Sequence, residues 1–145
     1  MFGMIVIAAL LGQTAPVAAR NSPQCPVRYA TRYIRHLADL PKQVRDDLLK
    51  DGQIADPDQP FEAYDNITDP LLPGARLVLA GESGLRWFVW IDRGGFARRD
   101  QVYGYGQLWD KVDHFTWYRS AELEGDPCIG INAFLDGVTT SARNH

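Results

Sequence analysis

The sequence predicts a small α+β protein with N-terminal helices, a four-stranded antiparallel meander, a short C-terminal helix and one disulfide bond. Three observations support this prediction. Residues 85–92 are apolar on both faces of an extended chain, helical patterns lie before and after them, and two cysteines lie near opposite ends. The length after the first 19 residues predicts a single domain over residues 20–145.

The central stretch, residues 85–92, reads Leu-Arg-Trp-Phe-Val-Trp-Ile-Asp and is apolar at both odd and even positions. A strand of this kind must be covered on both faces, which places it in the middle of a sheet. A buried helix would also be apolar all round. However, the turn-forming triplets Glu-Ser-Gly and Arg-Gly-Gly enclose the stretch, and its length is that of a strand.

Three further strands are predicted beside the central one, at residues 76–80, 96–103 and 113–119. Short glycine-bearing turns connect them, so consecutive strands are expected to pair antiparallel. The charged residues 98–100 break the apolar alternation of the third strand, as a bulged or half-exposed strand would. The triplet Gly-Tyr-Gly at residues 104–106 is interpreted as the end of that strand.

The helical patterns lie at both ends of the chain. Residues 21–40 are predicted as an amphipathic helix with a basic face, although the alternation of their apolar residues also suits a strand. Residues 41–51 carry one apolar stripe and are followed by Gly52, a residue typical of helix ends. Residues 126–137 begin with Asp-Pro, a cap followed by the proline favoured at the first helical position.

Two segments are predicted to lack regular structure: residues 51–73, which are acidic and contain four prolines, and the tail at residues 139–145. The acidic segment does not fit a calcium-binding EF-hand. Counted from Asp56, Phe61 replaces the turn glycine and Ile67 replaces the closing glutamate. Asn66 begins an Asn-Ile-Thr glycosylation triplet, which matters only in a eukaryotic source.

Residues 1–19 have the features of a secretory signal peptide. An apolar run is followed by Val17-Ala18-Ala19, small residues suited to signal peptidase, although no Lys or Arg precedes the run. The run is about a dozen residues long, shorter than the ~20 that a membrane-spanning helix needs. We therefore expect export to the periplasm or the cell exterior, with no stable membrane insertion once the mature chain begins near Arg20.

The two cysteines, Cys25 and Cys128, are predicted to form a disulfide bond, because an isolated pair in an exported protein usually bridges. The bridge closes a loop of about 100 residues, for which chain entropy predicts about 4–5 kcal/mol of stabilisation. The formal net charge of −3 argues against nucleic-acid binding, which depends on neutralising phosphates.

No catalytic or metal-binding motif is complete. The three histidines have no zinc-ligand spacing, and Ser83 lacks the second glycine of a nucleophile elbow. A pair of carboxylates for glycoside hydrolysis is recognised only in three dimensions. We therefore expect a non-catalytic protein without a cofactor or metal; a hydrolase with scattered carboxylates and His114 remains an alternative.

Ten aromatic residues lie between positions 87 and 118, and most are expected in the core. Four strands do not bury both faces completely, so part of this row is a candidate recognition surface. The candidate residues, predicted to be exposed and close together, are Tyr103, Tyr105, Trp109 and Arg99. We expect a protein partner in the cell envelope; the alternative is a glycan or peptidoglycan ligand. The sequence makes no prediction of the oligomeric state.

Overall fold

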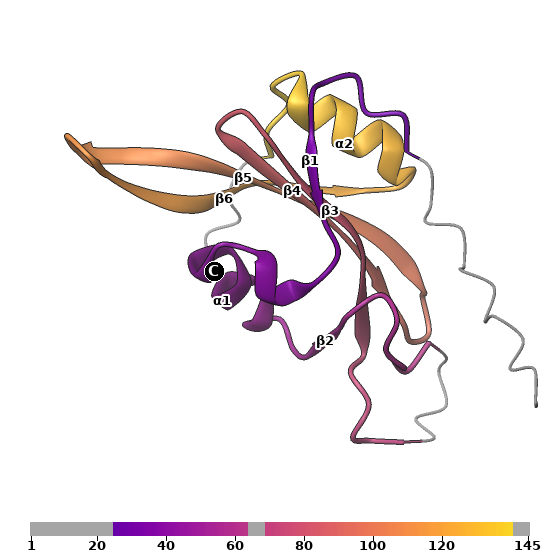
Figure 1. The fold of residues 1–145 in the computed structure, drawn as a ribbon. Coiled ribbons are helices and arrows are strands. Elements are labelled where there is room, and N and C mark those ends of the chain that lie inside the picture. Colours follow the sequence, from indigo (N-terminus) through magenta and orange to yellow (C-terminus); the bar gives the residue numbers. More distant parts are fainter. Residues whose placement is uncertain (1–24, 64–68, 141–145) are drawn as a thin grey trace, which may run out of the picture.

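The structure, a computed structural model, describes residues 25–63 and 69–140 (Figure 1). Its sheet has six strands in the order β1-β3-β4-β5-β6, and β2 pairs with β3. The strands are β1 (Arg32–Ile34), β2 (Ile54–Ala55), β3 (Ala75–Ser83), β4 (Arg86–Arg93), β5 (Arg99–Lys111) and β6 (His114–Glu124). The helices are the 3-10 helix η1 (Leu37–Asp39), α1 (Lys42–Leu49) and α2 (Pro127–Leu135).

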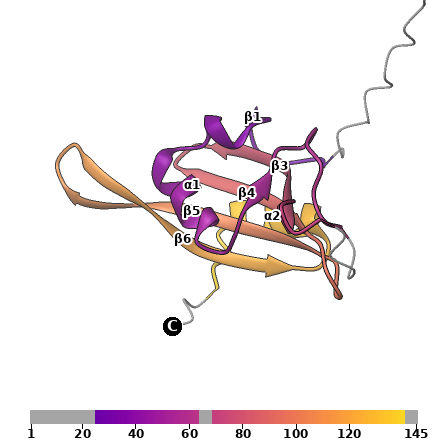
Figure 2. The same cartoon turned by 90° about the horizontal axis from the view of Figure 1, so that it is seen from below.

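The two α-helices cover opposite faces of the sheet (Figures 1 and 2). Val44 and Leu48 of α1 pack in one apolar cluster, while Ile131 and Phe134 of α2 pack in another. Strand β4 lies between β3 and β5 and contributes alternate side chains to the two clusters. The prediction of a central strand that is buried on both faces is confirmed.

The antiparallel α+β class is confirmed, but the sheet is larger than a four-stranded meander. Strands β3 to β6 form that meander, and β1 adds to it antiparallel beside β3. Strand β2 lies within the segment predicted to be irregular and pairs with β3 in parallel. Both additions join residues far apart in sequence, such as Ile34 and Ala80, so local patterns do not reveal them.

The first predicted helix, residues 21–40, is wrong over its described part. Residues 32–34 form β1 and residues 37–39 form η1. In β1, Ile34 is buried against the sheet, whereas Arg32 and Tyr33 are exposed. Pairing with β3 supplies hydrogen-bond partners for the backbone of this segment. Its structure therefore follows the alternating, strand-like pattern and not the helical one.

The other two helices are confirmed with small shifts at their ends. Helix α1 ends before Gly52, whose φ of 123° is readily adopted only by glycine. Helix α2 begins after Asp126, whose carboxylate accepts hydrogen bonds from the backbone N–H groups of Cys128 (2.9 Å) and Ile129 (3.1 Å). This cap satisfies donors that the first helical turn leaves unpaired.

Strand β5 does not end at residues 104–106, as predicted, but continues to Lys111. Gly104 lies directly beneath α2, where an added Cβ would come within 2.4 Å of the Phe134 ring. Because Phe134 is itself buried, no larger residue fits at position 104 without displacing the helix. The glycine therefore allows α2 to pack closely on a continuous strand.

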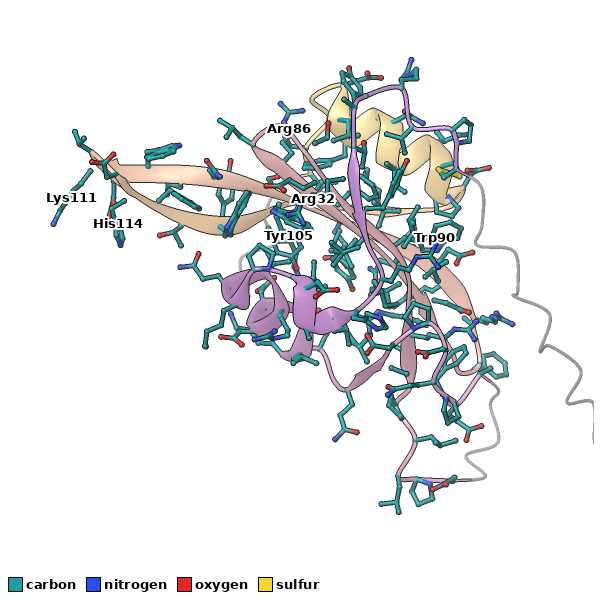
Figure 3. The ribbon with its side chains drawn as sticks, viewed as in Figure 1. Arg32, Arg86, Trp90, Tyr105, Lys111 and His114 are labelled. Carbon is teal, nitrogen blue, oxygen red and sulfur yellow. A yellow bond between two sulfur atoms is a disulfide. The ribbon has the colours of Figure 1, made fainter. Side chains whose placement is uncertain are left out.

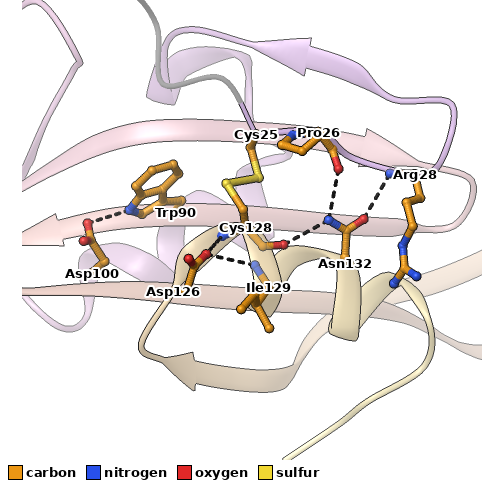
Figure 4. The surroundings of a disulfide bond; sticks show 9 residues. All are labelled: Cys25, Pro26, Arg28, Trp90, Asp100, Asp126, Cys128, Ile129 and Asn132. Atoms are coloured by element: carbon orange, nitrogen blue, oxygen red, sulfur yellow. Dashed lines mark hydrogen bonds between the residues drawn. A yellow bond between two sulfur atoms is a disulfide. The ribbon is translucent and has the colours of Figure 1, made fainter.

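A disulfide bond joins Cys25 to Cys128, with 5.3 Å between their Cα atoms (Figure 4). Beside it, the Asn132 side chain donates to the carbonyl oxygens of Pro26 (3.1 Å) and Cys128 (3.0 Å). The Asn132 Oδ1 atom accepts from the backbone N–H of Arg28 at 3.0 Å. These contacts hold the segment before β1 against α2.

Several predictions fall outside the described residues: the signal peptide at residues 1–19, the glycosylation triplet that begins at Asn66, and the end of the tail at residues 141–145. The first part of that tail is not free. Thr140 donates its backbone N–H to the Ser120 carbonyl (3.0 Å), and its hydroxyl accepts from the Glu122 N–H (2.9 Å). The segment therefore covers part of the outer edge of β6.

Candidate functional site

Strands β5 and β6 extend beyond the rest of the sheet as a two-stranded projection (Figure 1). The last residue pair between β4 and β5 is Trp87 with Tyr105. From Gly106 onward, β5 pairs only with β6 among the described strands. We call residues 106–118 the arm; Lys111 and His114 mark its tip (Figure 3).

The arm carries apolar side chains that no other element of the described chain covers. Leu108 is 61% exposed, Trp109 53%, Val112 91% and Tyr118 46%. Because Leu108 and Trp109 are consecutive in a strand, these side chains project from both faces of the arm. A cluster of large apolar residues on one projection is unusual for a surface that contacts only water.

Aromatic packing along the arm gives it a defined shape. The rings of Trp109 and Phe115 lie 5.2 Å apart, and those of Phe115 and Trp117 lie 5.5 Å apart in an edge-to-face arrangement. The backbone N–H of Trp117 donates to the Gln43 side chain of α1 at 2.8 Å. The arm is therefore stabilised by cross-strand pairs and attached to α1 at its base.

The four residues predicted as a recognition surface do not lie together. Tyr103 and Tyr105 are only 1% exposed, so the prediction that they are exposed is wrong. Both side chains belong to the core cluster under α1. Arg99 is exposed and lies 3.4 Å from Glu124, but it is ten residues from Trp109, which is about 33 Å along a strand. Only Trp109 lies on the arm.

Under α1, Tyr105 belongs to a polar cluster that connects the helix to the sheet. The Asp47 carboxylate accepts hydrogen bonds from the Tyr105 hydroxyl (2.9 Å) and from Arg119 Nε (2.8 Å). A second nitrogen of Arg119 donates to Asp51 at 3.0 Å. The charged and hydroxyl groups of this cluster therefore all have hydrogen-bond partners, as partly buried polar groups require.

The pKa values in this cluster shift in the directions expected of a structural ion pair. Burial raises the pKa of Asp47, but the charge and hydrogen bonds of Arg119 outweigh burial, so the net pKa is lowered. Burial raises the pKa of Tyr105 well above its usual range. Burial lowers the pKa of Arg119, but the nearby Tyr105 and Asp47 raise it further than burial lowers it. These groups therefore keep their charge states near neutral pH and are unsuited to proton transfer.

The Asp47–Arg119 pair predicts a specific acid sensitivity. The folded pKa of Asp47 lies below its unfolded value of about 3.9, so its contribution is complete above roughly pH 5 and is lost as the pH falls through the folded pKa. Near neutral pH, Asp47→Asn is expected to lower the free energy of unfolding by about 1–3 kcal/mol. Urea unfolding of both proteins should show this difference shrinking below pH 4; a difference independent of pH would contradict the assignment.

Tyr103 lies in an adjoining network on the same face. Its hydroxyl accepts from Arg93 (2.6 Å) and donates to Gln101 Oε1 (2.5 Å), and burial raises its pKa. The guanidinium of Arg119 lies 4.4 Å from the centre of its ring. The Gln101 amide in turn donates to Glu122 at 2.5 Å. The polar groups of this network bind one another within the sheet, and we assign it a structural role.

The residues considered for catalysis or metal binding are scattered. His114 lies at the tip of the arm, exposed, with its Nδ1 atom 2.5 Å from Asp110. Ser83 ends β3 at the hairpin to β4, as its turn residues suggested. Within residues 25–63 and 69–140, no three His, Cys, Asp or Glu side chains lie together in a way that could hold a metal ion.

A cleft of about 610 Å³ lies at the base of the arm, and we call it the root cleft. It is lined by Tyr29, Ser83, Gly84, Leu85, Arg86, Gly106, Gln107, Trp109, Tyr118, Leu135 and Asp136. Its charged groups already have partners. Arg86 donates to the carbonyls of Phe134 (3.0 Å) and Leu135 (2.9 Å), and Asp136 accepts from the Tyr29 hydroxyl (2.6 Å). The root cleft therefore offers mainly apolar and aromatic surface.

A larger cavity, about 760 Å³, lies at the opposite edge of the sheet, where β1 and β2 diverge beside β3. Its walls include Cys25, Tyr33, His36, Pro57 and Leu79. Apart from the disulfide-bonded Cys25, it contains none of the site residues predicted from the sequence, whereas Trp109 lines the root cleft. We therefore place the candidate functional site at the arm and the root cleft.

No protein-family description matches this chain, and no curated protein or solved structure is significantly similar to it. The geometry of the chain itself is therefore the basis for assigning a function. In the part of the chain that the structure describes, neither helix has the length and apolar character needed to cross a membrane.

Proposed function

We propose that this chain is a small exported module that binds a protein partner, in the cell envelope or outside the cell, through the arm. The observation that supports this most is the exposed apolar cluster of Leu108, Trp109, Val112 and Tyr118 on a projecting hairpin. Exposed apolar side chains concentrated on one element, here on both faces of the arm, commonly mark a protein interaction site. Tryptophan and tyrosine are also enriched among the residues that dominate binding energy at interfaces.

The construction of the arm supports a binding role. Two paired strands, with the Trp109, Phe115 and Trp117 rings in contact along them, hold the apolar side chains in place before any partner arrives. A preorganised surface loses less conformational entropy on binding than a flexible loop does. The buried polar clusters and the disulfide stabilise the sheet that carries the arm.

Export is part of the proposal. The apolar N-terminal run and the Val-Ala-Ala triplet predict secretion, and the Cys25–Cys128 bond is of a kind that persists in oxidising compartments. A stapled scaffold with an exposed apolar arm suits an inhibitor or an accessory factor of another envelope protein. Glycan binding is less well supported, because the charged groups of the root cleft are already hydrogen-bonded within the chain.

Site-specific photo-crosslinking in cells of the native host tests the proposal. A photo-reactive amino acid replaces Leu108 on the arm or, as a matched control, Leu71, which is 86% exposed in the loop before β3. We expect a discrete crosslinked product from position 108 and none from position 71. Crosslinking at both positions alike, or at neither, would argue against the arm as the binding surface.

A sedimentation experiment tests the glycan alternative. Purified mature chain is mixed with peptidoglycan sacculi and sedimented. We expect the chain to stay in the supernatant. Sedimentation with the sacculi that is abolished by Trp109→Ala would instead favour glycan binding at the exposed ring.

A further inference from the structure

The pairing within the arm determines which backbone groups of β5 face outward. In an antiparallel ladder, residues directly opposite each other alternate between pairs that exchange two hydrogen bonds and pairs that exchange none. Trp117 lies opposite Gln107, yet its N–H donates to the Gln43 side chain on the outer side of β6. The Gln107–Trp117 pair is therefore one without mutual hydrogen bonds.

It follows that the backbone N–H and C=O of Gln107 point away from β6, towards the open edge of β5. Trp109 lies two residues further along, opposite Phe115 in the same register, so its backbone groups point to the same side. Leu108 lies between them, and its backbone groups face Thr116 of β6. The open edge thus presents two donors and two acceptors, one of each from Gln107 and Trp109.

The other long edges of the sheet are covered by described residues. Thr140 contacts the β6 backbone at Ser120 and Glu122, and Gln43 contacts it at Trp117. The outer edge of β3 is paired with β1 and β2 at its two ends. The arm edge of β5 contains no proline and has no opposing strand among residues 25–63 and 69–140, and charged residues appear only towards its tip. Natural sheets usually protect such an edge.

The root cleft lies where this edge begins. Gln107 and Trp109 line it, together with Leu85 and Tyr118. The side-chain Oε1 of Gln107 is buried without a hydrogen-bond partner among the described residues, and so lacks a donor. An edge of free backbone groups next to an apolar cleft is the arrangement found where proteins bind an extended peptide by adding it to a sheet.

We infer that an extended segment of the partner protein adds as a further strand along residues 106–111 of β5 and places an apolar side chain in the root cleft. This inference rests on the proposed function and specifies its chemistry. Main-chain hydrogen bonds to Gln107 and Trp109 align the added strand with β5. The cleft selects for an apolar residue, because Arg86 and Asp136 are already engaged by the chain's own groups.

A random peptide library displayed on phage, selected against the immobilised mature chain, supplies the probe. We expect the enriched peptides to alternate apolar and polar residues. They should bind Gln107→Ala, which keeps the outward N–H, and bind Gln107→Pro at least about tenfold more weakly, because proline removes that donor and obstructs the edge. Equal affinity for the two variants, or the absence of any enriched peptide, would overturn the inference.

Amide hydrogen exchange on the unmodified chain gives a readout that does not depend on how the proline variant folds. On adding an enriched peptide, the amides of Gln107 and Trp109 should become protected, whereas Leu108, already paired with β6, should change little. Protection of all three alike, or of none, would contradict strand addition. If photo-crosslinking from Leu108 succeeds while this pattern is missing, the arm binds its partner in another way and the proposed function stands.

A second copy of the chain is the competing occupant. Light scattering of the purified mature chain measures its mass in solution and so shows whether a second copy occupies the edge. We expect a monomer at micromolar concentration. A dimer that Gln107→Pro dissociates and Gln107→Ala does not would assign the edge to self-association and overturn the inference of a separate partner.

Discussion

Replacing Tyr105 by Ala is expected to lower the free energy of unfolding by about 3–5 kcal/mol, the range for removing a large buried aromatic side chain. The ring is 1% exposed and packs in the core cluster beneath α1. Its loss leaves a cavity there and removes the hydroxyl that donates to Asp47. Urea unfolding monitored by circular dichroism measures the change.

Trp109→Ala is the matched control for the Tyr105 variant, because both residues lie on β5 and were predicted as one surface. Trp109 is half exposed and contacts Phe115, so its truncation is expected to change stability by less than about 1 kcal/mol. If Tyr105→Ala were as mild as Trp109→Ala, Tyr105 would not be a core residue and the division between core and arm would be wrong.

Removing the disulfide by Cys25→Ser with Cys128→Ser is expected to be comparably large. The two residues are 103 positions apart, and closing a loop of that length restricts the unfolded chain by about 4–5 kcal/mol in the chain-entropy account. The segment before β1 would then be held to α2 through Asn132 and through Asp136, which binds Arg28 and Tyr29. Thermal unfolding of the double variant against the oxidised mature chain measures the effect.

Mass spectrometry of the non-reduced chain is the control for that comparison. A linked peptide pair containing Cys25 and Cys128 is expected, and the same spectrum gives the mature N-terminus, expected near Arg20. Two free thiols that react with an alkylating agent, or a double variant as stable as the parent chain, would contradict the assigned role of the bond.

Local sequence patterns predicted the elements whose signals lie within one segment. The two-faced apolar run at residues 85–92 is long enough and well enough bounded to identify the central strand. The stripe of α1 and the Asp126-Pro127 cap of α2 are complete within single helices. The disulfide was predicted from the expected export and from the number of cysteines, neither of which requires knowledge of the fold.

Predictions that depend on distant residues were less accurate. The pattern of residues 21–40 favoured a helix, with a strand as the alternative, and pairing with β3, about fifty residues later, decides for the strand at residues 32–34. Gly104 resembles a strand end, but its role is set by the Phe134 ring that packs over it, thirty residues away. Neither partner is recognisable from the local pattern.

The candidate site was predicted only in part, and for a related reason. Tyr103, Tyr105 and Trp109 alternate along one strand and appear equivalent in the sequence. They differ in burial because β4 and α1 cover only part of β5. Tyr105 is the last residue paired with β4, and Trp109 lies beyond it. The short turn at Val112-Asp113 between two aromatic runs was the one signal that could have revealed the arm.

Whether the arm is the binding surface is decided by the yield of crosslinked product from position 108 compared with position 71 in living cells. The two positions carry the same native residue and are both exposed, so they differ mainly in whether they lie on the arm. We predict a discrete product from position 108 whose yield falls when excess unlabelled chain is added. Equal yields from the two positions would contradict the assignment of the arm as the binding surface.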